Sequence, residues 1–80
     1  MRVSVDSYAG PNRVEIPQRF RFAGREVNVV DSLDQWRGAN SIYRFFEVRD
    51  NDGNCYILRF DDARSEWELT LQQSARSQAD

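Results

Sequence analysis

The sequence predicts a mainly β protein: a small antiparallel barrel or rolled sheet of five to six strands, built as a meander of hairpins. Three observations support this. Apolar and polar residues alternate with a period of two in several short segments, as in half-buried strands. Turn signals separate these segments at short intervals, which favours antiparallel pairing. A sheet of this size must curl to bury one face, and curling gives a barrel or a rolled sheet.

The chain has 80 residues, which is enough for one domain. We expect a single β domain over residues 1–72. Residues 73–80 have no apolar periodicity and are expected to form a disordered tail. A core this small leaves roughly 3–5 kcal/mol of stability. Self-association through an apolar face would add to the buried area.

The first strand is expected at residues 2–8, where Val3 and Val5 alternate with polar residues. The second is expected at residues 14–22. Pro17 lies within it and cannot donate a hydrogen bond to a β ladder, so this segment is either an edge strand or a strand broken at Pro17. One side of the second segment carries Val14, Ile16, Gln18, Phe20 and Phe22.

A tight hairpin is predicted between the second and third strands. A two-residue loop at positions 23–24, Ala-Gly, would place Arg21 opposite Glu26 and Phe20 opposite Val27. The hairpin therefore fixes the start of the third strand.

The end of the third strand has two interpretations. Residues 31–36 either extend the strand with a bulge or form one helical turn capped by Asp31 or Ser32. The extended strand, running to about Trp36, is the favoured interpretation. Residues 37–42, RGANSI, then form a loop rich in small and polar residues.

The strongest local signal is the turn at residues 50–53, Asp-Asn-Asp-Gly. Asp favours the first turn position because its carboxylate accepts backbone N–H groups, and Gly favours the last because it adopts positive φ without strain. A type I turn with Gly53 as the bulge residue pairs Arg49 with Cys55. The alternative is a two-residue turn at 52–53, which slips the pairing by one residue and mixes the two faces of the hairpin.

In the first of these registers the two faces of the hairpin differ in character. One face is apolar, and the other mixes aromatic and charged residues. The apolar face carries Phe46, Val48, Tyr56, Leu58 and Phe60. The mixed face carries Tyr43, Phe45, Glu47, Arg49, Cys55, Ile57 and Arg59.

The last strand alternates cleanly, with Trp67, Leu69 and Leu71 on one side and polar residues on the other. A loop at residues 62–65 would bring Trp67 opposite Phe60. That pairing agrees with the apolar face of the first register and supports it.

The composition excludes several kinds of chemistry. The chain has no histidine and a single cysteine, Cys55, so it has neither an intrachain disulfide nor a Cys/His zinc site. Histidine is also the usual general acid and base at neutral pH. The glycines stand singly, which is unlike a phosphate-binding loop. We therefore expect no catalytic activity, no metal and no small-molecule cofactor.

Two further observations bear on location. No apolar run approaches the roughly 20 residues needed to span a bilayer. The first ten residues lack the apolar segment of a signal peptide. A cytoplasmic protein without a membrane partner is expected.

Binding therefore becomes the expected role, and two candidate surfaces follow. The first is the mixed hairpin face, with Tyr43, Phe45 and Ile57 among Arg49 and Arg59. Arg59 falls opposite Phe45 and is expected to lie over its ring. If the N-terminal strands cover this face, it is a second core layer; if it is open, it is an aromatic–arginine patch. The second candidate is Trp36-Arg37.

The charge of the chain limits its partners. A net charge of −2 argues against a protein that coats nucleic acid by charge alone. All eleven cationic residues are arginine, which reflects either a GC-rich genome or selection for forked donors that pair with carboxylate or phosphate.

Three segments resemble a small family of uncharacterised bacterial domains: RFRFAGREVNVVDSLDQWRG, YRFFEVRDNDGNCYIL and SEWELTL. The resemblance spans residues 19–71. Similar segments occur at the C-terminal end of some Y-family translesion-polymerase-like proteins, so the resemblance implies an accessory module near DNA repair. The matching positions are Arg19, Phe20, Gly24, Asp34, Trp36, Arg37, Gly38, Tyr43, Phe46, Val48, Gly53, Tyr56, Leu58, Trp67 and Leu69.

Two functional hypotheses follow. The first is a non-enzymatic protein-interaction module that contacts a protein partner, or a second copy, through one of the two candidate surfaces. The alternative is a nucleic-acid-binding accessory domain linked to DNA repair. Its candidate contact residues are Arg19, Arg21, Arg49 and Arg59.

Overall fold

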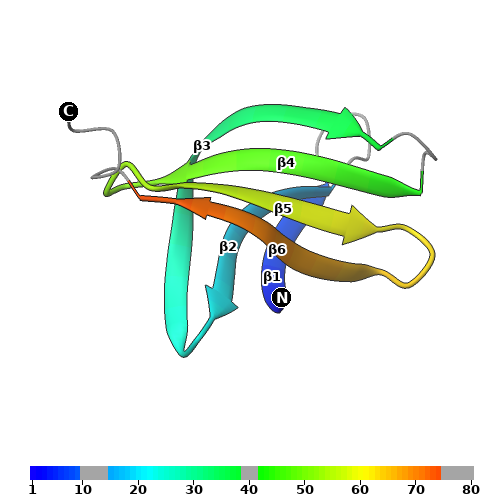
Figure 1. The fold of residues 1–80 in the computed structure, drawn as a ribbon, viewed down its shortest axis with the longest axis horizontal. Helices are drawn as coiled ribbons and strands as arrows, with labels where there is room; N and C mark the ends of the chain where they lie inside the picture. The colour runs from blue at the N-terminus through cyan, green and yellow to red at the C-terminus, as the bar shows by residue number, and fades with distance from the viewer. Residues whose placement is uncertain (10–14, 39–41, 75–80) are drawn as a thin grey trace.

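The computed structural model describes residues 1–9, 15–38 and 42–74. In these residues six antiparallel strands follow one another in chain order and close into a barrel (Figure 1), which confirms the predicted fold class. Each strand pairs with the next, and β1 returns to pair with β6. The strands are β1 Arg2–Ala9, β2 Glu15–Phe22, β3 Arg25–Arg37, β4 Tyr43–Asp50, β5 Cys55–Asp61 and β6 Glu66–Gln73.

The hairpin between β4 and β5 has the first of the two predicted registers. Arg49 pairs with Cys55, and every pair down to Tyr43 with Asp61 follows in step. The amide of Gly53 donates to the carbonyl of Asp50 at 3.1 Å, and Gly53 has φ 86°. The alternative two-residue turn is therefore wrong.

The carboxylate of Asp50 organises this turn and is itself buried, with 6% of the residue exposed. It accepts hydrogen bonds from the amides of Asp52 and Asn54, both at 2.9 Å, and from the Tyr56 hydroxyl at 2.8 Å. Burial raises the pKa of Asp50, but the hydrogen bonds from Tyr56, Asn54 and the backbone outweigh it and hold the pKa below its usual value. Burial, together with Asp50, raises the pKa of Tyr56 to about 12.

The hairpin between β2 and β3 is also as predicted. Arg21 pairs with Glu26 and Phe20 with Val27 across a two-residue turn. Both turn residues have positive φ, 51° for Ala23 and 74° for Gly24, as the tightest hairpin turns require.

The core of the barrel comes from the inward side of every strand. Phe20 meets Tyr56 edge-on with ring centroids 5.1 Å apart, and Trp67 lies against Phe46 and Phe60 at 5.3 and 4.8 Å. Trp67 is paired with Phe60, as the sequence predicted. The buried apolar residues are Val3, Phe20, Val27, Phe46, Val48, Tyr56, Leu58, Trp67 and Leu69.

The prediction that Leu71 shares the buried side of β6 is wrong. Leu58 pairs with Leu69 but Ile57 pairs with Leu71, so Thr70 is an extra residue at a β-bulge. The bulge shifts the alternation by one, and Leu71 points outward with 52% of the residue exposed.

A bulge also corrects the predicted side of β2. Asp6 pairs with Arg19 and Ser7 with Pro17, which leaves Gln18 as the extra residue. Pro17 is fully buried and Gln18 is exposed, so Gln18 does not share a side with Phe20. The strand continues through Pro17, and its ladder to β3 begins only at Arg19, so Pro17 is not required to donate to it.

Strand β3 runs unbroken from Arg25 to Arg37, which confirms the extended interpretation and excludes the helical turn. Its pairing with β4 shifts twice, between Val29 and Asp31 and again between Ser32 and Asp34. The extra residues are Val30 and Leu33.

The predicted chain ends fall partly outside the described residues. Strand β6 reaches Gln73, one residue past the predicted domain end at 72. The rest of the predicted tail, from residue 75, lies outside the described residues, as do residue 14 of the second strand and residues 39–41 of the predicted loop. No helix in the described ranges is long and apolar enough to cross a membrane.

Candidate functional site

The mixed face of the β4–β5 hairpin lies on the outside of the barrel. Strands β1 and β2 form part of the barrel wall and do not lie over this face, so the covered alternative is wrong. Tyr43, Phe45, Ile57 and Arg59 are half-buried and Arg49 is exposed. The face is therefore an outer surface with partly exposed rings.

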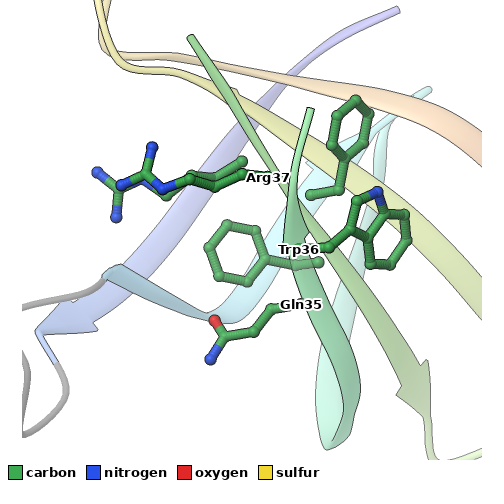
Figure 2. A pocket seen from close by; sticks show the side chains of 6 residues that line it. Gln35, Trp36 and Arg37 are labelled. Atoms are coloured by element: carbon green, nitrogen blue, oxygen red, sulfur yellow. The ribbon is translucent and has the colours of Figure 1, made fainter. Parts of the chain in front are cut away.

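At the centre of this surface, Trp36 of β3 stacks on Phe45 of β4. The two residues are opposite one another in the ladder, their ring centroids are 5.4 Å apart and their planes are 5° from parallel. Trp36 remains 40% exposed. Figure 2 shows its indole on the opposite side of β3 from Gln35 and Arg37.

Gly38 supports this stack from the end of β3. Its amide donates to the carbonyl of Tyr43 at 2.9 Å, which draws the chain close to β4. A Cβ at this position would lie 3.2 Å from a ring carbon of Phe45, so a larger residue would displace the ring.

Arg59 lies over Tyr43, with its guanidinium carbon 4.3 Å from the ring centroid. It also forms an ion pair with Glu68. Arg59 is opposite Phe45 in the ladder, as predicted, but the prediction that it lies over that ring is wrong. Phe45 instead stacks on Trp36, and Arg59 lies over the ring of Tyr43, two residues before Phe45 on β4.

The two arginines of β2 among the predicted nucleic-acid contacts form ion pairs with carboxylates. Arg19 Nε is 2.9 Å from Asp6 and 3.9 Å from Glu26. Arg21 Nε is 3.3 Å from Glu26. Phosphate binding through β2 would therefore compete with carboxylates of the same chain.

The other two predicted arginines are also paired. Arg49 Nη2 is 2.6 Å from Asp31. The hydrogen bond to Asp31 raises the pKa of Arg49. Arg59, the last of the four predicted nucleic-acid contacts, forms an ion pair with Glu68.

Two carboxylates lie beside the aromatic stack. Asp34 and Glu47 are opposite one another in the β3–β4 ladder, two positions from the pair of Trp36 and Phe45. Neither forms an ion pair among residues 1–9, 15–38 and 42–74. Opposed like charges destabilise a β ladder, so their position is better suited to a cationic partner than to the isolated fold.

Sequence reasoning missed one cluster, which joins the ends of three segments. Asp62 lies 2.6 Å from Arg44 Nη2 and 3.6 Å from Arg37 Nη1. Arg44 also lies over Phe60, 5.5 Å from the ring centroid. The hydrogen bond from Arg44 is the main cause that lowers the pKa of Asp62. Only the β3–β4 register, with Arg37 opposite Arg44, would have revealed this cluster.

The described part of the chain holds no group of three or more His, Cys, Asp or Glu side chains placed to bind a metal. Its outer surface instead offers stacked rings, carboxylates and paired arginines, which suit non-covalent contacts. Comparisons of the chain with protein-family models, curated proteins and solved structures give no match.

Proposed function

We propose that this chain is a non-enzymatic protein-interaction module. Its contact surface is the outer face made by Trp36, Phe45, Asp34, Glu47 and Ile57, which we call the Trp36 face. The single observation that carries the proposal is the flat Trp36–Phe45 stack on the outside of the barrel.

The stack has the properties of an interface anchor. Aromatic side chains dominate the binding energy of protein interfaces because they bury large areas at a small entropic cost. Here the rings are held by each other and by the backbone of Gly38, so little freedom remains to be lost on binding. A preorganised, partly exposed ring pair therefore favours association.

The charges around the stack favour a protein partner with Lys or Arg at its contact. Asp34 and Glu47 lie in the ladder beside Trp36 and Phe45. A cation between these two carboxylates would remove their mutual repulsion. The net charge of −2 favours a basic partner too, since it steers such a protein toward the surface.

A capture experiment tests the proposal. The immobilised chain should retain a specific protein from an extract of its source cells, and Trp36→Ala should abolish that retention. Asn28→Ala is the control, since Asn28 is also an exposed residue of β3 but lies where this strand pairs with β2 and not with β4. Retention that survives Trp36→Ala, or that Asn28→Ala removes equally, would contradict the role of the Trp36 face.

The second candidate is a nucleic-acid-binding accessory domain, to which the resemblance described above adds a link to DNA repair. The exposed Trp36 ring favours it, because bases stack on such rings. The ion pairs of Arg19, Arg21, Arg49 and Arg59 weigh against it. Titration of the chain with single-stranded DNA at low and high salt discriminates: tight, salt-sensitive binding supports this candidate, and no binding at low salt removes it.

A further inference from the structure

Strand β3 changes neighbours halfway along its length. Its ladder to β2 covers only residues 25–28, opposite Arg19–Phe22. From Val29 onward it pairs with β4 alone among the described residues. Figure 1 shows β3 bending away from β2 to run along β4. The first residues of β2 and the second half of β3 are thus separated within the barrel wall.

Three adjoining hollows lie along the second half of β3, and two of them are also lined by β2. Their volumes are about 320, 260 and 190 Å³. The first and second are both lined by Ile16 and Ser32, and the second and third by Gln35 and Phe46. They therefore form one groove along β3 from Val29 to Arg37. At 3.3 Å per residue its length is roughly 26 Å, the span of about eight extended residues.

Two of the hollows combine exposed apolar residues with the polar side chains of Ser32, Asp34 and Gln35. Val30 and Leu33, the extra residues of the two β3 bulges, line these hollows and are 53% and 42% exposed. Tyr8 and Ile16 line the side formed by β1 and β2. A bulge re-aims the side chain that it carries. Here both bulges present an apolar residue to the groove, where neither adds to the buried core.

One end of the groove is cationic. Arg37 and Arg44 line it with Gln35, Phe46 and the stacked rings of Trp36 and Phe45 (Figure 2). The two guanidiniums share the carboxylate of Asp62. Two cationic groups that share one carboxylate leave a net positive charge, so this end favours an acidic group on the occupant.

We propose that this groove binds an extended peptide segment of a partner protein, with apolar side chains against Val30 and Leu33 and an Asp or Glu side chain at Arg37 and Arg44. The proposal rests on the proposed function for the class of partner and extends the contact from the Trp36 face, which the groove meets at Trp36 and Phe45, to Val30 and Leu33. A nucleic acid carries a negative charge at every nucleotide, whereas the groove has Arg37 and Arg44 at one end and the carboxylate of Asp34 in its middle. The match between this charge pattern and a peptide of mixed character selects the occupant.

The test is a selection from a displayed library of random peptides of about nine residues, followed by fluorescence anisotropy with the enriched peptides. These should share alternating apolar residues and an acidic residue near one end. Leu33→Asp and Arg44→Gln should each weaken their binding by about tenfold or more, because each removes a contact or a charge-assisted hydrogen bond. Leu71→Asp, an exposed apolar position outside the groove, should leave binding unchanged.

Several results would overturn the proposal. One is a selection that enriches no peptide, and another is a set of enriched peptides without an acidic position. A third is unchanged peptide binding by Leu33→Asp, provided that this variant has the far-ultraviolet circular dichroism spectrum of the parent chain. A dimer that Leu33→Asp dissociates would replace the peptide by a second copy. Protein capture that persists in Leu33→Asp, without any peptide binding, would remove the groove and keep the proposed function. Peptide binding without protein capture would keep the groove and remove the proposed function.

Discussion

Substitution of Tyr56 by Phe tests the buried polar contact that closes the β4–β5 turn. The Tyr56 hydroxyl donates to the Asp50 carboxylate at 2.8 Å, while the Tyr56 ring packs on Phe20 at 5.1 Å. Tyr56→Phe keeps the ring and removes only the hydrogen bond. A hydrogen bond to a charged group contributes about 1.5–3 kcal/mol. We expect a loss of about 2 kcal/mol in the free energy of unfolding, a large part of the roughly 3–5 kcal/mol available to so small a core.

The assay is urea unfolding at neutral pH, followed by the fluorescence of the tryptophans. Thermal unfolding gives a second measure, because a loss of about 2 kcal/mol lowers the melting temperature of a domain of this size by roughly 8–16 °C. Tyr43→Phe is the matched control, because the Tyr43 hydroxyl belongs to a half-buried ring on the outer surface; its effect should stay within about 0.5 kcal/mol. Equal effects of the two variants would refute the reasoning.

The same contact predicts a pH dependence with two limits. The pKa of Asp50 is lower in the folded chain than in the unfolded chain. Its contribution is complete above the unfolded value of about 3.9 and is lost as pH falls through the folded pKa. The pKa of Tyr56 is raised to about 12, so its contribution is complete below the unfolded value of about 10 and is lost as pH rises toward 12. Tyr56→Phe should remove the alkaline loss and reduce the acid loss, as measured by unfolding at both extremes.

Three further predictions concern the bulges and turns. Leu69→Ala should cost about 2–5 kcal/mol and Leu71→Ala less than about 0.5, because the bulge at Thr70 buries only Leu69; similar losses in urea unfolding would contradict the bulge. Gly38→Ala should displace the Phe45 ring and lose part of the roughly 0.5–1.5 kcal/mol of aromatic stacking, and an unchanged near-ultraviolet circular dichroism spectrum would contradict this. Gly24→Ala meets no atom within 4 Å but sits at φ 74°, so thermal unfolding should show a loss of about 1 kcal/mol from backbone strain alone.

Local signals predicted the hairpins well. The register from Asp50 to Asn54 follows from turn chemistry within five residues, and the 23–24 turn fixes its neighbours in the same way. Both turns contain their own cause, namely Gly at positive φ and, in the first, an Asp carboxylate at the right distance.

Features that depend on a single extra residue could not be predicted from periodicity. Gln18 and Thr70 each shift the alternation of a strand, and nothing in the local pattern distinguishes them from regular positions. These bulges arise from fitting one strand to another around a closed barrel. The incorrect sides of Gln18 and Leu71 follow from that.

The residues of the outer hairpin face were predicted, but their contacts were not. Tyr43, Phe45 and Arg59 were grouped correctly on one hairpin face, since the hairpin register alone determines it. The stack of Trp36 on Phe45 depends on the β3–β4 register, which two bulges shift and no turn signal fixes. The β2–β3 separation and its groove were missed for the same reason.

The ladder that joins β1 to β6 has only two register pairs, Arg2 with Glu68 and Val3 with Trp67, fewer than any other ladder among the described strands. It also links residues that are far apart in the sequence, so its formation carries the largest loop-closure cost in the molecule. We expect the β1–β6 ladder to form last during folding and to open first when the protein is destabilised. Opening of this ladder would leave β1 and β6 as unpaired edge strands, so aggregation of this chain should begin at these strands.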